Sequence, residues 1–157
     1  MNNVEYIAQH QHDANADSLW EYFSSVMSWV KTKFNRYRKE MAGVPWGLLY
    51  NRYKHDTRTP EEIESEVSRL MQDEDVTNKK GIYSYIFTGE EKELSIRTFT
   101  DAHKREAYER QGGTCACCGN EFPLEGLQAH HVKPWHSGGK TIPSNLKLLC
   151  PTCHRDV

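Results

Sequence analysis

The chain has 157 residues, of which 37% are hydrophobic and 27% are charged, a balance typical of a folded protein with a modest core. No stretch approaches the roughly 20 apolar residues of a membrane-spanning helix, and the polar amino terminus has no secretory h-region, so we expect a cytoplasmic protein without a membrane partner. The formal net charge of −2 excludes the strongly basic composition that would by itself indicate a nucleic-acid binder.

Charge and cysteine are unevenly distributed along the chain. Residues 1–96 carry 12 Lys and Arg against 16 Asp and Glu, whereas residues 97–157 carry 8 against 6 and five of the eight histidines. All five cysteines also lie in residues 97–157. The carboxyl-terminal part is therefore the better candidate to contact phosphates. We predict two domains with a boundary after residue 96.

Residues 17–40 are predicted to form a helix, because large apolar residues recur there at steps of three and four. The stripe consists of Leu19, Trp20, Phe23, Val26, Met27, Val30 and Phe34. The far end of this segment is basic, with Lys31, Lys33, Arg36, Arg38 and Lys39. Two interpretations of these cations stay open: a solvated helix end that suits the helix dipole, or a contact to the DNA backbone.

Two further helices are predicted before residue 73. Gly43 and Pro45 precede a short apolar helix at 46–53. Thr59-Pro60-Glu61-Glu62 has the spacing of a capping box with Pro at the first helical position, so a helix is predicted from there to about Gln72.

The middle of the chain is less regular. Residues 73–81 are predicted to be a connector, and residues 82–99 fit either strands or a short helix. Thr100 and Asp101 are expected to open another helix, which Gly112-Gly113 should end. The amino-terminal region is thus mainly helical, and its predicted role is substrate recognition or dimerisation.

Two Cys-x-x-Cys pairs in the last third predict a metal site. Cys115 and Cys118 form the first pair, and Cys150 and Cys153 form the second about thirty residues later. In a reducing compartment, such pairs indicate metal binding before disulfides. The two Cys-x-x-Cys pairs together supply four thiolates for a tetrahedral structural Zn²⁺. Cys117 has the wrong spacing and is predicted to be a bystander; free thiols in a packed core are the alternative.

Between the cysteine pairs lie His130 and His131, followed by Pro134, Gly138-Gly139 and Asn145, and His154 directly follows Cys153. Adjacent strand residues point to opposite faces, so the two neighbouring histidines cannot have the same role in a regular strand. One can hold a metal while the other faces a water molecule beside it. His154, just after Pro151, should begin the last helix.

This combination resembles the HNH (ββα-metal) endonuclease family, in its subtype with four zinc-binding cysteines. The resemblance covers about residues 101–157 and implies a β-hairpin followed by a helix, gripping one catalytic divalent cation. It implies that His131 is the general base, that His130 and His154 bind the cation, and that Asn145 braces the loop and orients His131. The predicted fold class is α+β, a helical region followed by a zinc-stapled HNH module at 97–157.

Many family members have Asp at the position of His130. Since imidazole binds Mg²⁺ less well than a carboxylate does, the preferred cation is expected to shift from Mg²⁺ toward Mn²⁺ or Ni²⁺. Upstream, the segments WEYFSSVMSWVKTKF, KKGIYSYIFTG and LSIRTFTDAHKREAYERQGG resemble proteins in which an HNH nuclease follows a ParB-like nuclease domain, associated with restriction of foreign or modified DNA.

The predicted function is metal-dependent hydrolysis of DNA phosphodiester bonds, with double-stranded DNA as the expected partner. Expected phosphate contacts are Lys104, Arg105, Arg110, Lys133 and Lys140. A non-catalytic zinc ribbon that binds DNA or protein, and an enzyme using zinc catalytically, are the alternatives. A single site makes one cut, so cleavage of both strands would need a homodimer or successive nicks, and both stay open. Association with a larger restriction or mobile-element protein also stays open.

Overall fold

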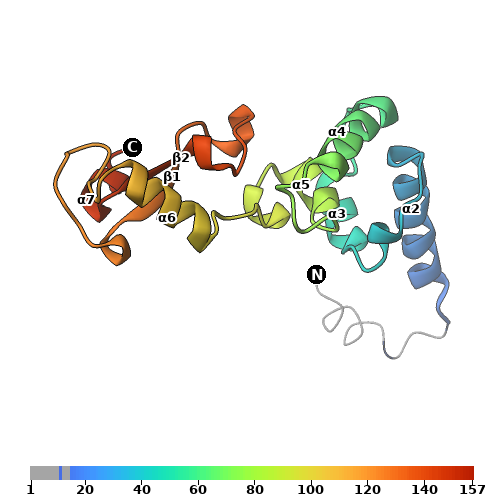
Figure 1. The fold of residues 1–157 in the computed structure, drawn as a ribbon. Helices are drawn as coiled ribbons and strands as arrows, with labels where there is room; N and C mark the ends of the chain where they lie inside the picture. The colour runs from blue at the N-terminus through green and yellow to red at the C-terminus, as the bar shows by residue number, and fades with distance from the viewer. Residues whose placement is uncertain (1–10, 12–14) are drawn as a thin grey trace. The chain divides into compact units, whose positions relative to one another are not determined.

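The computed structural model describes residue 11 and residues 15–157, and the chain divides into two compact units (Figure 1). Unit 1 contains the described residues up to Gln72 together with Asn78–Leu94, and unit 2 contains Asp73–Thr77 and Ser95–Val157. The division after Leu94 lies close to the predicted domain boundary after residue 96. Unit 1 is helical and unit 2 contains a small sheet, so the fold is α+β. No helix in the described ranges has the length and apolar character needed to cross a membrane.

The first described helix of unit 1, α2 (Asp17–Lys33), begins where predicted but ends well before the predicted limit at residue 40. Phe34 leaves helical geometry, with φ −121° and ψ 91°. At this point the buried Lys33 amine donates to the main-chain oxygen of Asp56 at 2.7 Å and lies 3.3 Å from its carboxylate. The last residue of α2 is thus held by a segment far away in the sequence.

Helices α3 (Trp46–Tyr53) and α4 (Pro60–Gln72) have the predicted bounds. The capping box of α4 is also confirmed. The Thr59 N–H donates to the Glu62 carboxylate at 2.7 Å, and the Glu62 N–H donates to the Thr59 hydroxyl at 3.2 Å. The start of α4 therefore depends on short-range chemistry, which explains why the sequence alone predicts it.

The ambiguous segment after residue 81 forms helix α5 (Ile82–Thr88) and a 3-10 turn at Glu91–Leu94. Ile82, Tyr83 and Ile86 are buried at helical spacing, which favours the helix over a strand. Aromatic rings fill the core of unit 1. The ring centroid of Phe34 lies 5.2 Å from that of Trp46 and 5.3 Å from that of Tyr83.

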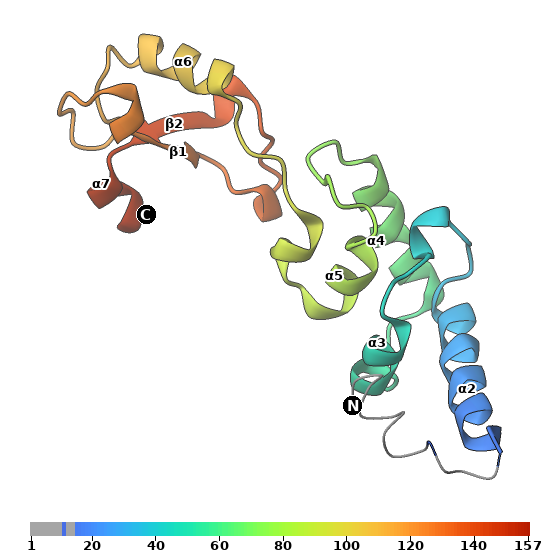
Figure 2. The same cartoon turned by 90° about the horizontal axis from the view of Figure 1, so that it is seen from below.

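Unit 2 is built on two antiparallel strands, β1 (Gln128–His131) and β2 (Leu146–Leu149). Helix α6 (Asp101–Arg110) is capped by the Thr100 hydroxyl, which accepts from the His103 N–H at 3.2 Å. Helix α7 (Pro151–Arg155) follows β2 directly. Figure 2 shows α6 and α7 on opposite sides of the strand pair. Short 3-10 turns occur at Leu124–Gly126, Trp135–Ser137 and Pro143–Asn145.

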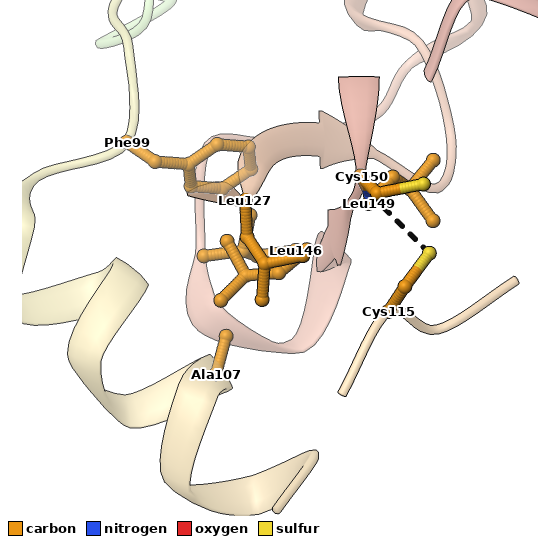
Figure 3. Close-up of a cluster of buried hydrophobic side chains, with 8 residues drawn as sticks. Phe99, Ala107, Cys115, Leu127, Leu146, Leu149 and Cys150 are labelled. Atoms are coloured by element: carbon orange, nitrogen blue, oxygen red, sulfur yellow. Dashed lines mark hydrogen bonds between the residues drawn. The ribbon is translucent and has the colours of Figure 1, made fainter. Parts of the chain in front are cut away.

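The core of unit 2 lies between α6 and the strands (Figure 3). Leu146 and Leu148 alternate with the exposed Lys147 and face Ala107 of α6. The core cluster consists of Phe99, Ala107, Cys115, Leu127, Leu146, Leu148, Leu149 and Cys150. Two of its members are cysteines of the predicted metal site, so the small apolar core and that site are continuous.

Residues Asp73–Thr77, predicted to be a connector, belong to the second unit although unit 1 continues at Asn78. Val76 pairs with Ile96 in an antiparallel bridge, and the Arg97 N–H donates to the Asp75 carbonyl at 2.7 Å. The Asp73 carboxylate accepts from the Trp135 indole at 3.1 Å and from the Lys140 amine at 2.7 Å. This acidic segment therefore packs against the loop between β1 and β2.

Candidate metal and catalytic site

Four cysteines converge in unit 2. One sulfur from each of Cys115, Cys118, Cys150 and Cys153 lies within 4.8 Å of the other three. Cys117 is exposed and lies outside this group, in agreement with its prediction as a bystander. Four cysteine sulfurs at such distances fit a tetrahedral metal site.

The electrostatics of the cluster also fit a bound cation. Burial acts to raise the pKa of Cys115, but main-chain N–H groups of Cys118, Cys150 and Cys117 lower it to about 6. One of these, the Cys150 N–H, donates to the Cys115 sulfur at 3.3 Å and appears as the dashed line in Figure 3. The neighbouring sulfur of Cys150, together with burial, raises the pKa of Cys153. All four groups can be thiolates together only with a cation among them.

A second pair of potential ligands is formed by one histidine of β1 and one histidine of α7. His130 is near the end of β1, opposite Lys147 of β2, and His154 is on α7. Their ring centroids are 5.4 Å apart, with the ring planes at 85°. Burial, followed by the nearby His154 and Lys147, lowers the pKa of His130. The site therefore favours a neutral imidazole at His130, the form that binds a metal about 2.1 Å from a ring nitrogen.

Among residue 11 and residues 15–157, the four cysteines form the one group of three or more Cys, His, Asp or Glu side chains that lie close enough together to hold an ion. No third side chain of these types therefore joins His130 and His154 in the described part of the chain. The histidine pair would thus leave most coordination positions of a cation to water or to substrate oxygens. An open position of this kind is what distinguishes a catalytic metal site from a closed structural one.

The side chain of Asn145 forms hydrogen bonds to the main chain of the loop between β1 and β2. Its side-chain oxygen accepts from the Lys133 N–H at 2.8 Å, and its side-chain nitrogen donates to the carbonyls of Lys133 and Lys140, each at 2.9 Å. Gly139 is buried in this loop, where an added Cβ would lie 1.8 Å from the Lys133 carbonyl oxygen. Gly138 has a φ of 85°, in the left-handed region. The Gly-Gly pair is therefore required by close packing and backbone geometry.

His131 lies on the opposite face of β1 from His130, the face that carries Leu146. Its ring centroid is 4.2 Å from that of the buried Phe99, and its Nε2 is 3.1 Å from the Thr141 hydroxyl. The imidazole also lines a cavity of about 500 Å³ together with Phe99 and Lys104. The ring is thus held on two sides and still borders open space.

Burial is the main cause that lowers the pKa of His131, and the neighbouring His130 acts in the same direction. The carboxylate of Asp75 acts in the opposite direction, by favouring the protonated ring. The net result favours a neutral imidazole near neutral pH, which is the form that can accept a proton.

The predicted phosphate contacts have different surroundings. Arg105 and Lys133 are exposed, and Lys104 lies beside the cavity next to His131. Lys140 is engaged with Asp73 at 2.7 Å. The guanidinium of Arg110 donates to the carbonyls of Pro143 at 3.1 Å and of Leu146 at 2.9 Å, which gives Arg110 a structural contact whatever its role toward DNA.

Several neighbours of His131 were not identified from the sequence. Phe99 precedes α6, Thr141 follows the Gly-Gly pair, and Asp75 comes from the segment predicted to be a connector. The available signal was the spacing of Asp73 and Asp75, because residues two positions apart in an extended segment point to the same side. In the structure both carboxylates contact the loop between β1 and β2. No local rule connects such a pair to a histidine more than fifty residues away.

Residues 115–157 match the profile of the HNH endonuclease family, and this carboxyl-terminal part of the chain belongs to that family. A type IV methyl-directed restriction enzyme of Escherichia coli K12, EcoKMcrA, is 41% identical over 51 residues. The aligned region covers 29% of this chain and 18% of that enzyme, so the likeness concerns only a small part of the relative. No solved structure matches the chain.

Proposed function

We propose that this protein is a cytoplasmic, metal-dependent endonuclease that hydrolyses phosphodiester bonds of double-stranded DNA. His131 is the general base, His130 and His154 bind one divalent cation, and the four cysteines bind a structural Zn²⁺. The observation that carries the proposal is the opposite placement of the two consecutive histidines on β1. His130 pairs with His154, whereas His131 lies against Phe99 and Thr141 beside a cavity.

The arrangement divides the chemical tasks of phosphodiester hydrolysis. His131 accepts the proton of the attacking water, and its partial burial keeps the imidazole neutral for this step. A cation held by His130 and His154 would stabilise the negative charge on the phosphate and on the leaving oxygen. Asn145 keeps the intervening loop, and hence the phosphate position, in place.

The likeness to a methyl-directed restriction enzyme supports DNA as the substrate, and foreign or modified DNA as the candidate class. The exposed Arg105 and Lys133 and the cavity-lining Lys104 are available for phosphate contacts. Each phosphate contact contributes affinity that falls with salt concentration. Unit 1 is proposed to contribute substrate recognition or dimerisation.

Nicking of supercoiled plasmid tests the proposal. The zinc-loaded protein is incubated with Mg²⁺, Mn²⁺ or Ni²⁺, and the His131→Ala variant is compared with His55→Ala, which removes an exposed histidine of unit 1. We expect cation-dependent nicking by the wild-type protein and His55→Ala, and a loss of at least about a hundredfold in His131→Ala at unchanged zinc content. Equal nicking by both variants would refute the role of His131, and DNA binding without nicking would favour the zinc-ribbon alternative.

A further inference from the structure

We propose that Thr141 is a positioning residue that holds the His131 imidazole in the tautomer with the proton on Nε2, so that Nδ1 is the basic nitrogen. This inference rests on the proposed function, in which His131 accepts a proton from water. It assigns a task to a residue that has no role in the motif as described above.

The hydrogen bonds of the Thr141 hydroxyl determine the tautomer. A hydroxyl has one proton to donate, and a carbonyl oxygen can only accept. The Thr141 hydroxyl donates to the Arg97 carbonyl at 3.1 Å, so its proton is committed there. Toward His131 Nε2, at 3.1 Å, the same oxygen must therefore accept. Nε2 then carries the ring proton, and the lone pair of the neutral imidazole is on Nδ1.

Thr141 itself is held in place by the upstream acidic segment. It is only 5% exposed, and its N–H donates to the carboxylate of Asp75 at 3.0 Å. Asp75 is also 5% exposed, and its carbonyl accepts from the Arg97 N–H at 2.7 Å. The buried Asp75 thus holds the main chain of Thr141, and it also holds the main chain of Arg97, whose carbonyl accepts from the Thr141 hydroxyl. A hydroxyl fixed in this way has one orientation available.

The second constraint on the imidazole is Phe99. The two ring centroids are 4.2 Å apart with an angle of 36° between the planes, so Phe99 covers one face of the imidazole. Packing against Phe99 limits tilting of the ring, and the hydrogen bond to Thr141 selects the orientation and the tautomer. Such positioning matters for catalysis, because a base displaced by about 1 Å can lose on the order of a hundredfold in rate.

Long-range proton–nitrogen correlation NMR of the zinc-loaded protein of 157 residues tests the tautomer directly. The protein is labelled with ¹⁵N-histidine and measured above the pKa of the ring, without added divalent cation, and the His131 signals are assigned with His131→Ala. We expect protonated Nε2 and unprotonated Nδ1 in the wild-type protein and in Thr141→Ser, which retains the hydroxyl. We expect Thr141→Val, which has similar volume but no hydroxyl, to show a mixture of tautomers.

Single-turnover cleavage at saturating DNA tests the consequence. Thr141→Val should cleave about tenfold to a hundredfold more slowly with DNA affinity little changed, whereas Thr141→Ser should recover most of the rate. Thr32→Val is the matched control, because it removes a threonine hydroxyl that donates to the Ser28 carbonyl at 3.0 Å on the exposed side of α2. A purely structural role would lower stability in Thr141→Val without changing the His131 spectrum.

Two results would overturn the inference while leaving the proposed function intact. One is a wild-type spectrum with the proton on Nδ1. The other is a Thr141→Val variant that keeps both the wild-type tautomer and the wild-type rate. Absence of cleavage by the wild-type protein with every cation would instead refute the proposed function, and with it the catalytic meaning of Thr141.

Discussion

The rings of His130 and His154 lie almost perpendicular to each other with their centroids 5.4 Å apart, although the residues come from β1 and α7. The antiparallel pairing of β1 with β2 and the direct connection from β2 to α7 bring them together. A five-residue helix is thus sufficient to place the last histidine of the sequence opposite the first histidine of the strand pair.

The preferred cation is the first testable prediction. Because both proposed protein ligands, His130 and His154, are imidazoles, we expect plasmid nicking to be faster with Mn²⁺ or Ni²⁺ than with Mg²⁺, since nitrogen ligands suit transition metals. Replacing His130 with Asp should shift the preference toward Mg²⁺. The measurement is the initial nicking rate across the three cations at equal concentration. A wild-type protein that is fastest with Mg²⁺ would contradict the expectation.

The cysteine cluster allows a second test with a matched control. Cys150→Ser should reduce bound zinc and unfold unit 2, because a structural zinc site contributes on the order of 10 kcal/mol of folding free energy. Cys117→Ser, at the exposed neighbour of the cluster, should retain both zinc and fold. Metal analysis and the fluorescence of Trp135, the one tryptophan of unit 2, report the two effects. Full zinc content in Cys150→Ser would show that Cys150 is not a zinc ligand.

Arg110 and Arg105 separate structural from DNA-binding cations on the same helix. Arg110→Ala should destabilise the protein by about 1–3 kcal/mol, because two main-chain carbonyls at the start of β2 lose a charged donor. Arg105→Ala should leave stability unchanged, weaken DNA binding and reduce its salt dependence. Thermal unfolding and DNA titrations at several salt concentrations measure both. If Arg110→Ala instead lowered DNA affinity at unchanged stability, and Arg105→Ala did not, Arg110 would be the DNA-binding residue and the structural role given to it would be wrong.

Asp73 is expected to stabilise the loop between the strands. Asp73→Ala removes the acceptor of the Trp135 indole and of the Lys140 amine, and should cost about 1–3 kcal/mol of unfolding free energy. Glu74→Ala, at the exposed position next to it, should have almost no effect. Trp135 fluorescence during urea unfolding, in variants that lack the other tryptophans, gives the comparison. Equal stability of the two variants would mean that the segment does not hold the loop.

Unit 1 offers a test based on pH. The hydrogen bonds from Arg38 lower the pKa of Glu64 below its ordinary value of 4.5, against the opposing effect of burial. A carboxyl whose pKa is lower in the folded state stabilises the fold above its unfolded pKa, and this contribution disappears as the pH falls through the folded pKa. Glu64→Gln should therefore be less stable by about 1–2 kcal/mol at pH 7, and the difference should shrink below pH 4.5.

The control for this measurement is Glu66→Gln on the same helix. Glu66 pairs with Arg69 at an exposed position, where an ion pair contributes less than about 1 kcal/mol. Urea unfolding followed by tryptophan fluorescence reports mainly unit 1, which contains Trp20, Trp29 and Trp46. A stability difference between Glu64→Gln and wild type that does not change with pH would contradict the assignment.

Local signals in the sequence were sufficient for several features. The bounds of α3 and α4, the start of α6 at Thr100 and the capping box at Thr59 depend on residues within one or two helical turns. The four metal-site cysteines were also identified from the spacing within each pair and the distance between the pairs. The opposite faces of His130 and His131 follow from the alternation of side chains along a strand.

Tertiary structure decided the features that depend on residues far apart in the chain. Lys33, the last residue of α2, contacts Asp56, and Asp75 reaches Thr141 across more than sixty residues. Helical periodicity and strand alternation contain no information about such partners, because each records only which face of its own element is apolar. The sequence by itself therefore indicated the HNH endonuclease family for the carboxyl-terminal part and the four cysteines that cluster there, whereas packing between distant segments decided which groups surround His131.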